Sequence, residues 1–308
     1  ITLWKDVPGL MTTDPRLVPT ARIVPQLNVR EAAELAYYGA KVLHPRALIP
    51  LARVRVPVFV RPFTDPTAPG TEISVRHTLT RYPVKALSIV RDQALVTVTG
   101  NGMLGVPGIA ARTFAALQQA GISVTLISQA SSEHSICLCV PAERGAEARV
   151  ALEKAFALEL SRRELEGMDV QRGMATLAVV GLGMAGSPGI ASRMFTSLSS
   201  AGVNIVAIAQ GSSELNISVV IAEADAEVAA QAVHDEFQLD KIGGGGLREE
   251  DRLDVVLLGV GLIGRELLRM LPRVRRRVKP TIVGLVDRSG FVFEPEGLTA
   301  RQLATYAK

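Results

Sequence analysis

An internal duplication is the feature that most constrains how this 308-residue chain folds. The stretch Gly100–Arg112 returns as Gly181–Arg193, and the turn Gln129–Glu133 returns as Gln210–Glu214, with a constant offset of 81 residues. Roughly 19 of about 41 aligned positions are identical without a gap, which chance does not produce. Two copies of one small module therefore occupy the middle of the chain.

Each copy predicts the same order of strands and helices. In the first copy, residues 94–99 are rich in β-formers, and residues 109–119 have the apolar spacing of a helix. The further elements expected are strands at 122–128 and 135–140, a helix at 145–160 and, in the second copy, a late helix near 226–237. A β-α-β-β-α-β order predicts a ferredoxin-like sandwich with helices on one face of an antiparallel sheet. The expected fold class is α/β, with these α+β modules at its centre.

The paired modules resemble tandem ACT domains, which sense small molecules in amino-acid biosynthesis. The resemblance rests on Pro107–Ala110, Gly121–Val124 and Gln129–Glu133, with their counterparts from Pro188 to Glu214. Generic ACT domains share the loop–helix glycine but not both Gln-x-Ser-Ser-Glu turns. These turns are similar to those of the threonine-regulated aspartate kinase–homoserine dehydrogenases. The resemblance implies an amino-acid effector, L-threonine, and a homodimer or homotetramer formed through the ACT domains.

The residues of the repeat suit an amino-acid sensor. The Gly/Pro loop presents backbone N–H groups at a helix N-terminus, where a carboxylate is favoured. Gln129 and Gln210 each offer a donor and an acceptor at a strand end, which can satisfy the hydroxyl group of threonine. The alternative is that the glutamines only fix turns, which is the role we prefer for the neighbouring serines. We expect effector contacts at Gln129, Gln210, Gly108, Ile109, Gly189 and Ile190.

Residues 1–80 resemble the C-terminal part of the aspartate kinase catalytic domain. The motifs are Trp4–Arg16, Tyr38–Pro45 and the stretch Arg53–Gly70. In that family the first motif forms the nucleotide-binding loop, and its Arg and Lys residues can neutralise polyphosphate charge. The resemblance assigns ATP contacts, with Mg²⁺, to Lys5, Asp6, Met11, Arg16, Lys41 and Val42. Lysine-sensitive relatives often have Thr and Tyr at the places of Lys5 and Met11. The family's N-terminal Lys-Phe-Gly-Gly motif is absent, so we expect no kinase turnover from this chain.

A dinucleotide-binding pattern begins at residue 253. A buried-type strand, Val255–Leu258, leads directly into Gly259–Gly264, and a helix and a second strand ending at Asp287 follow. Gly259 permits the tight turn, Gly261 the close approach of a pyrophosphate, and Gly264 helix–strand packing. The expected cofactor-binding residues are Gly259, Gly261, Leu262, Ile263, Gly264, Asp287, Arg288 and Ser289. Asp287 suits a ribose hydroxyl, whereas Arg288 and Ser289 suit a 2′-phosphate, so NAD and NADP both stay open.

The last segment resembles the N-terminus of homoserine dehydrogenase, which follows the ACT pair in the fusion proteins. The expected domains are the end of a kinase domain (1–82), two ACT domains (83–168 and 169–242), a linker (243–252) and the start of a dehydrogenase domain (253–308). The parent enzyme is expected to phosphorylate L-aspartate with ATP and to reduce aspartate semialdehyde to homoserine with NAD(P)H. The chain is expected to be incomplete for both reactions. The alternatives are a monofunctional lysine-sensitive aspartate kinase and a stand-alone regulatory protein.

Composition argues against several other classes of protein. The only two cysteines, Cys137 and Cys139, sit in an apolar run without a second Cys/His cluster, so we expect reduced core thiols, no metal site and a cytoplasmic location. The net charge is +4, but the densest basic run, residues 273–279, has no aromatic residues to stack bases, so no nucleic-acid partner is expected. No apolar stretch approaches the roughly 20 residues of a membrane helix.

Overall fold

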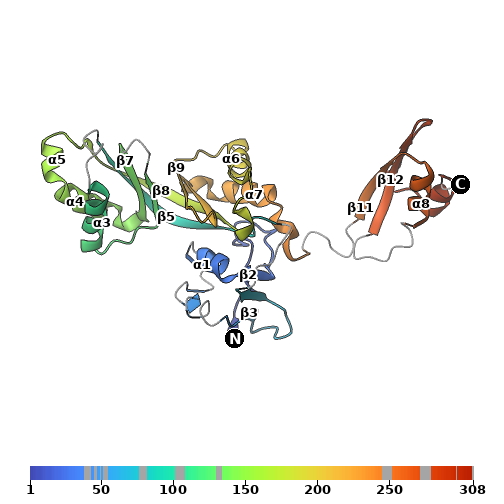
Figure 1. The fold of residues 1–308 in the computed structure, drawn as a ribbon, viewed down its shortest axis with the longest axis horizontal. Helices are drawn as coiled ribbons and strands as arrows, with labels where there is room; N and C mark the ends of the chain where they lie inside the picture. Colours follow the sequence, from blue (N-terminus) through green and yellow to red (C-terminus); the bar gives the residue numbers. More distant parts are fainter. Residues whose placement is uncertain are drawn as a thin grey trace. The chain divides into compact units, whose positions relative to one another are not determined.

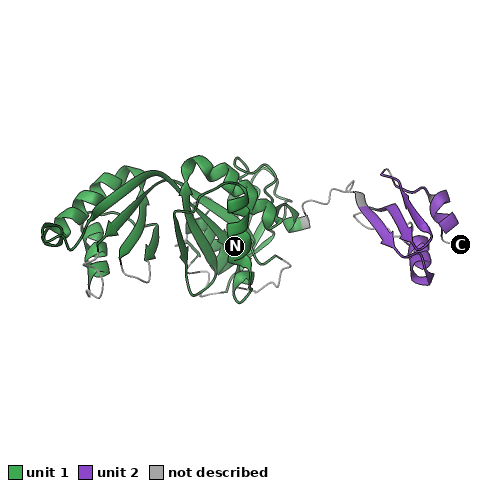
Figure 2. Ribbon diagram, turned by 90° about the horizontal axis from the view of Figure 1, so that it is seen from above, with its two compact units in different colours: residues 1–243 green, residues 244–308 purple. Residues whose placement is uncertain are grey.

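The computed structural model describes residues 1–37, 43–44, 47–48, 50, 55–75, 82–100, 108–129, 134–244, 252–270, 279–295 and 297–306. The chain divides into two compact units, Ile1–Gly243 and Gly244–Lys308 (Figure 2). Among the described residues, no helix combines the length and the apolar character that a membrane crossing requires.

The described residues of the N-terminal segment, 1–82, form a four-stranded sheet with helix α1 (Val29–Tyr37) beside it (Figure 1). The sheet order is β1-β3-β4-β2, with β1 (Thr2–Lys5) parallel to β3 (Val58–Pro62) and β2 (Gln26–Asn28) parallel to β4 (Thr71–Ser74). Helix α1 begins directly after β2 and buries Val29, Ala32 and Leu35 at helical spacing.

The two repeats build one continuous six-stranded sheet, in the order β6-β7-β5-β8-β10-β9. Its strands are β5 (Ala86–Thr99), β6 (Leu126–Gln129), β7 (Ser135–Pro141), β8 (Gly167–Val180), β9 (Ala207–Gln210) and β10 (Asn216–Ala222). Its helices are α3 (Ile109–Gln119), α4 (Gly145–Ala155), α5 (Ala157–Ser161), α6 (Ile190–Ser200) and α7 (Ala226–Glu236). Short 3-10 helices lie at Ala142–Arg144, Leu182–Met184, Glu223–Asp225 and Leu239–Gly244.

The two modules exchange strands through β5 and β8, each of which is 14 residues long. The first half of β5 (86–90) pairs with the second half of β8 (176–180), and the second half of β5 pairs with both β7 and the start of β8. The register of the pair shifts between Val90 and Leu95. Consequently β8 closes the first module and opens the second, while β5 opens the first module and closes the second.

This exchange gives each module the ferredoxin-like strand order 4-1-3-2. The βαββαβ expectation and the α/β fold class are confirmed, but the closing strand of the second module precedes the first module in sequence. The expected boundary between residues 168 and 169 falls inside β8. Local periodicity cannot reveal such a pairing, because a strand contributes the same pattern to either neighbour.

Helices cover one face of each half of the sheet, with α3 and α4 on the first module and α6 and α7 on the second (Figure 1). The first module encloses its own core around Leu138, Leu152 and Phe156. The second module shares a core with the N-terminal segment, since Leu10, Val60 and Leu177 belong to one buried cluster. This shared core explains why the N-terminal segment and both modules form a single compact unit.

The opposite face of the sheet carries a small core of its own. Each of the six strands contributes one buried residue to it: Leu95, Leu126, Cys139, Met174, Ala207 and Val220. Cys137 packs against this cluster, and neither cysteine is in a disulfide. Burial raises the pKa of the Cys139 thiol to about 11, so it is an unreactive core thiol, as expected. In the described part of the chain, no group of three His, Cys, Asp or Glu side chains could hold a metal ion.

In the second unit, the described residues form a three-stranded sheet together with helices α8 (Leu262–Met270) and α9 (Ala300–Tyr306). Strand β11 (Arg252–Leu258) is parallel to β12 (Lys279–Asp287), which is antiparallel to β13 (Gly290–Phe293). Helices α8 and α9 pack on one face over Ile282 and Leu285. The strand–glycine–helix–strand order expected from the sequence is therefore present.

Candidate functional site

A groove of about 500 Å³ lies between β6 and β9, the two edge strands of the six-stranded sheet. The Ser128 hydroxyl donates a hydrogen bond of 2.7 Å to the Ile208 carbonyl oxygen, which holds the two strands near each other. The described residues that line the groove are Tyr37, Val124–Gln129, Ile208–Gly211 and Asn216. It therefore draws residues from both modules and from the N-terminal segment.

Gln129 and Gln210 occupy matching places in this groove. Each is the last residue of its strand, opposite Ile136 of β7 and Ile217 of β10 respectively, and each side chain is exposed. Two glutamines that are 81 residues apart in sequence thus line one surface depression. Each amide offers both a donor and an acceptor there.

The N-terminal segment reaches the groove through α1. The Tyr37 hydroxyl lies 3.4 Å from the Val124 carbonyl oxygen, to which it donates, and Tyr37 lines the groove. One turn earlier on the same helix, Glu34 accepts a hydrogen bond of 2.5 Å from the Asn216 side-chain amide. Tyr37 and Asn216 were not among the residues expected from the sequence. Their place in the groove depends on the packing of α1 against the modules, and no local sequence pattern predicts that packing.

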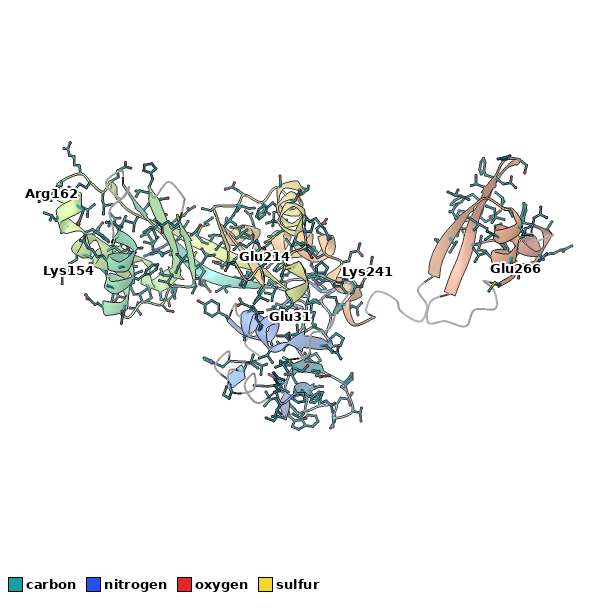
Figure 3. All side chains as sticks on the ribbon, in the orientation of Figure 1. Glu31, Lys154, Arg162, Glu214, Lys241 and Glu266 are labelled. Carbon is teal, nitrogen blue, oxygen red and sulfur yellow. The ribbon has the colours of Figure 1, made fainter. Side chains whose placement is uncertain are left out.

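Glu31, at the start of α1, ties the N-terminal segment to the second module (Figure 3). Its carboxylate is fully buried and lies 2.8 Å from the Lys85 ammonium group, which is itself buried. It also accepts hydrogen bonds of 2.8 Å from the backbone N–H groups of Asn28 and Leu182. A buried charge needs such complete pairing, because an unpaired one loses its hydration without replacement.

The Gly/Pro loop of the second module is held by the turn Gln210–Glu214 of the same module. The Glu214 carboxylate accepts a hydrogen bond of 2.6 Å from the Gly186 backbone N–H. Glu214 itself has a left-handed backbone, with φ of 51°. This role for Glu214 was not predicted from the sequence. The glutamate that recurs at the end of both turns was the sequence signal that could have indicated it. The matching residues of the first module, 101–107 and 130–133, lie outside the described residues.

The expected backbone contacts of the effector lie elsewhere. Gly108 and Gly189 precede α3 and α6 in left-handed conformations, with φ of 93° and 89°. Ile109 and Ile190 are 6% and 7% exposed and belong to the two module cores. These four residues are not among the described residues that line the groove.

The residues expected to bind ATP are distributed along the first loop. Lys5 ends β1, Asp6 follows it, and Met11 forms an isolated bridge with Ile23. Arg16 makes an exposed ion pair of 2.6 Å with Asp14, and its side-chain hydrogen bond holds the pKa of that carboxyl below its usual range. Lys41 and Val42 lie outside the described residues.

The second unit has the backbone geometry of a dinucleotide fingerprint. Gly259 has φ of 93°, and its N–H donates to the Val286 carbonyl oxygen at 2.7 Å, which joins the ends of β11 and β12. A Cβ at Gly264 would lie 2.4 Å from the Gly259 oxygen, whereas one at Gly261 would meet no atom within 4 Å. The turn is thus tightly packed on the protein side and open where a phosphate would approach.

The acidic residue of this fingerprint lies at the expected strand end. Asp287 accepts hydrogen bonds from the Ser289 hydroxyl (2.6 Å) and from the Ser289 backbone N–H (2.8 Å). These bonds lower the pKa of Asp287, and the bond from the hydroxyl has the larger effect. Leu262 and Ile263 begin α8 and are 89% and 85% exposed. Arg288, which follows Asp287 in the sequence, is exposed.

Comparison with known proteins finds two families of domain within the first unit. A family model described as ACT domain matches residues 96–156 and 177–237, and one described as amino acid kinase family matches residues 1–62. Solved structures agree. Aspartate kinase of Clostridium acetobutylicum has a TM-score of 0.69 at 26% identity, over 77% of this chain and 54% of that one. Escherichia coli aspartokinase III in complex with aspartate and ADP has a TM-score of 0.65 at 32% identity, over 76% of this chain and 51% of that one.

Several relatives found by sequence are named as bifunctional enzymes. The bifunctional aspartokinase/homoserine dehydrogenase of Haemophilus influenzae is 39% identical over 96% of this chain and 36% of its own length. A chloroplastic counterpart from Arabidopsis thaliana is 39% identical over 97% of this chain and 33% of its own length. This chain therefore spans about a third of the length of these relatives. On these findings, the chain is similar over nearly its whole length to one part of the bifunctional aspartokinase/homoserine dehydrogenases.

Proposed function

We propose that this chain is the amino-acid-sensing part of a bifunctional enzyme, and that the effector binds in the groove between β6 and β9. The observation that carries the proposal is the pairing of Gln129 and Gln210 in one groove. Tyr37 supports it further, because it brings the N-terminal segment into contact with the same space. An amino acid bound there touches both modules and the kinase-type segment at once.

L-Threonine is the proposed effector. The groove has the side-chain amides of Gln129, Gln210 and Asn216, the hydroxyl groups of Tyr37, Thr125 and Ser128, and backbone groups of two edge strands. Such a surface can pair the carboxylate, the ammonium group and the hydroxyl of a small polar amino acid. An analogue without the hydroxyl would leave a donor or acceptor unpaired, which costs about 1–3 kcal/mol.

The whole enzyme is proposed to phosphorylate L-aspartate with ATP and Mg²⁺, and to reduce aspartate semialdehyde to homoserine with NAD(P)H. In this proposal the domains run over 1–82, 83–168, 169–242 and 253–308, with a linker at 243–252. Lys5, Asp6, Met11, Arg16, Lys41 and Val42 belong to the ATP site. The residues of the dinucleotide site are Gly259, Gly261, Leu262, Ile263, Gly264, Asp287, Arg288 and Ser289. The open space at Gly261 supports the second site.

A homo-oligomer through the ACT domains is also proposed. Ile127 of β6 and Ile208 of β9 are 51% and 42% exposed on the two edge strands. Edge strands with apolar side chains favour association with another chain. The two unpaired thiols fit a reducing compartment such as the cytoplasm.

A bifunctional parent is favoured over a monofunctional kinase by the extent of the similarity. Chloroplastic aspartokinase 1 of Arabidopsis thaliana matches 77% of this chain, whereas the bifunctional relatives match 96% and 97%. The second unit, with its dinucleotide fingerprint, gives the chain a part that a kinase alone does not need.

Thermal unfolding with a panel of amino acids tests the choice of effector. L-Threonine at about 100 times its Kd should stabilise the folded chain by about 2.7 kcal/mol and raise the Tm accordingly. L-Valine, which has the same shape without the hydroxyl, should raise the Tm much less, as should L-lysine and L-methionine. Equal shifts with threonine and valine would reject the hydroxyl argument, and a larger shift with lysine would reassign the effector.

A further inference from the structure

Thr12 is a buried junction between the N-terminal segment and the ACT pair. Its backbone N–H donates to the Arg22 carbonyl oxygen at 2.7 Å, and its own carbonyl oxygen accepts from the Leu87 N–H of β5 at 2.8 Å. Its hydroxyl oxygen accepts from the Arg22 N–H at 3.0 Å and lies 3.0 Å from Nε2 of His234 on α7. Thr12 and His234 are both fully buried. Thr12 is thus bonded to its own loop, to β5 and to α7.

The repeat shows that His234 is not required by the module fold. The offset of 81 holds along the late helices, since Phe156 and Phe237 match and receive the guanidinium groups of Arg112 and Arg193. At the position that matches His234, the first module has Glu153, which is 39% exposed and pairs with Arg149 on its own helix. Only the module that packs against the N-terminal segment has a buried histidine there.

Thr12 lies in the loop that carries residues proposed for the ATP site. Met11 and Arg16, two of the residues proposed for the ATP site, flank Thr12 within one short loop. The same loop is anchored by hydrogen bonds from Leu10 N–H to the Thr71 hydroxyl (2.8 Å) and from Val24 N–H to the Leu10 carbonyl oxygen (2.8 Å). Leu10 therefore anchors the loop to its own segment, whereas Thr12 contacts the regulatory module.

We propose that His234 is a positioning residue of the second ACT module: it holds Thr12, and through Thr12 the loop of residues 11–16, in a position that depends on effector binding. The inference rests on the proposed effector groove, because β9, which carries Gln210, and α7, which carries His234, belong to the same module. A shift of α7 relative to β5 alters the hydrogen bond to Thr12 directly. Coupling between sites in allosteric proteins is typically about 5–150-fold, and this contact carries a part of it.

Hydrogen–deuterium exchange of the chain tests the positioning role without any ligand. The reporters are the amides of Thr12 and Leu87, whose N–H groups donate to Arg22 and Thr12. In His234→Leu both amides should exchange about ten-fold faster or more, whereas His234→Gln, whose amide can either donate to or accept from the Thr12 hydroxyl, should resemble the wild type. Glu153→Leu is the matched control in the first module, and the Val219 amide in β10 reports global loosening. Unchanged exchange at Thr12 in His234→Leu would overturn the proposal.

Addition of L-threonine tests the link to the effector. In the wild type, saturating L-threonine should change the exchange of residues 10–24, and this response should be lost in His234→Leu but kept in His234→Gln. A response that persists in His234→Leu would overturn the link. If the wild type binds no L-threonine in calorimetry while the ligand-free result holds, the proposed effector fails and the positioning role stands. If His234→Leu does not fold, Thr12→Val removes the same hydrogen bond at its other partner, and both exchange experiments are repeated with it. Thr12→Ser keeps the hydroxyl and should restore the wild-type exchange.

Discussion

Single residues in this chain join parts that are far apart in sequence, and Glu31 is the strongest case. Its buried carboxylate pairs with Lys85 and accepts backbone N–H groups of Asn28 and Leu182, so it connects α1, the start of β5 and the loop after β8. The ion pair is worth little by comparison with an apolar contact, because desolvation offsets the attraction between the charges. Removing one partner is a different matter, since the other charge then stays buried and unpaired.

Glu31→Gln and Lys85→Met should therefore each lower the free energy of unfolding by about 3–5 kcal/mol. The matched surface pair is Arg149–Glu153, where Glu153→Gln should cost less than about 1 kcal/mol. Urea unfolding of the first unit, followed by circular dichroism, gives all three values. Losses below about 1 kcal/mol for both buried variants would mean that the pair is solvated in solution.

His234 makes stability depend on pH in a defined window. Burial lowers its pKa, and the charges of Asp235 and Asp240 raise it by smaller amounts. With the folded pKa below the unfolded value of about 6.5, the stability contribution is complete above pH 6.5. As the pH falls below that value, the unfolded chain takes up the proton first, so the free energy of unfolding decreases by at most about 1.4 kcal/mol per pH unit.

The check is urea unfolding at pH 7.5 and at pH 5.5. The decrease between the two should be smaller in His234→Gln than in the wild type, because the variant cannot take up this proton. His134→Gln, at an exposed histidine, should keep the wild-type decrease. An identical pH dependence in all three proteins would show that His234 titrates normally.

At the scale of elements, the exchange of β5 and β8 depends on a bend at matching places. Asp92 in β5 and Gly173 in β8 are 81 residues apart and have left-handed backbones, with φ of 56° and 69°. They lie where the pairing of β5 with β8 shifts its register. The Asp92 N–H is satisfied there by the Glu223 carboxylate at 3.1 Å. The bends let one long strand serve two modules.

Gly173→Ala should lower the free energy of unfolding by about 1–2 kcal/mol, the cost of a left-handed backbone for a residue with a Cβ. The cost is conformational alone, since a Cβ at Gly173 would meet no atom within 4 Å. Asp92→Gly, the reciprocal change, should stay within about 0.5 kcal/mol of the wild type. If Gly173→Ala proved neutral by urea unfolding, the strands would be joined without this bend.

Most elements that depend on local pattern were predictable, but the helix expected at 145–160 is divided into α4 and α5, and the strand expected at 122–128 begins only at Leu126. The repeat fixed the helices at 109–119 and 226–237 to within a residue, and Gly121 ends its helix with φ of 64°, as a C-terminal glycine does. The strand exchange was not predictable, because pairing between distant strands has no local signature. For the same reason, the sequence indicated Gln129 and Gln210 but not their common groove, nor Tyr37 and Asn216 beside them. It also did not indicate the contact of Thr12 with His234. The assignment of effector contacts at Gly108, Ile109, Gly189 and Ile190 stays a prediction.

At the scale of the whole molecule, the first unit combines a sensor with the segment that it is proposed to control. Tyr37 and Glu34 of α1 contact the two modules near the groove, and Thr12 contacts α7. Lys41, a residue of the proposed ATP site, follows Tyr37 by four positions in the sequence. An effector that orders the groove therefore acts on a helix and a loop that both belong to the kinase-type segment.

The central claim is that the amino acid binds between β6 and β9, and isothermal titration calorimetry of the chain with L-threonine tests it most directly. The wild type should show saturable binding, and Gln129→Ala and Gln210→Ala should each weaken it about ten-fold or more, since a hydrogen bond to a charged ligand is worth about 1.5–3 kcal/mol. Gln119→Ala, at an exposed glutamine on α3, should bind as the wild type does. Wild-type affinity in both groove variants, or no binding by a folded wild type, would contradict the account.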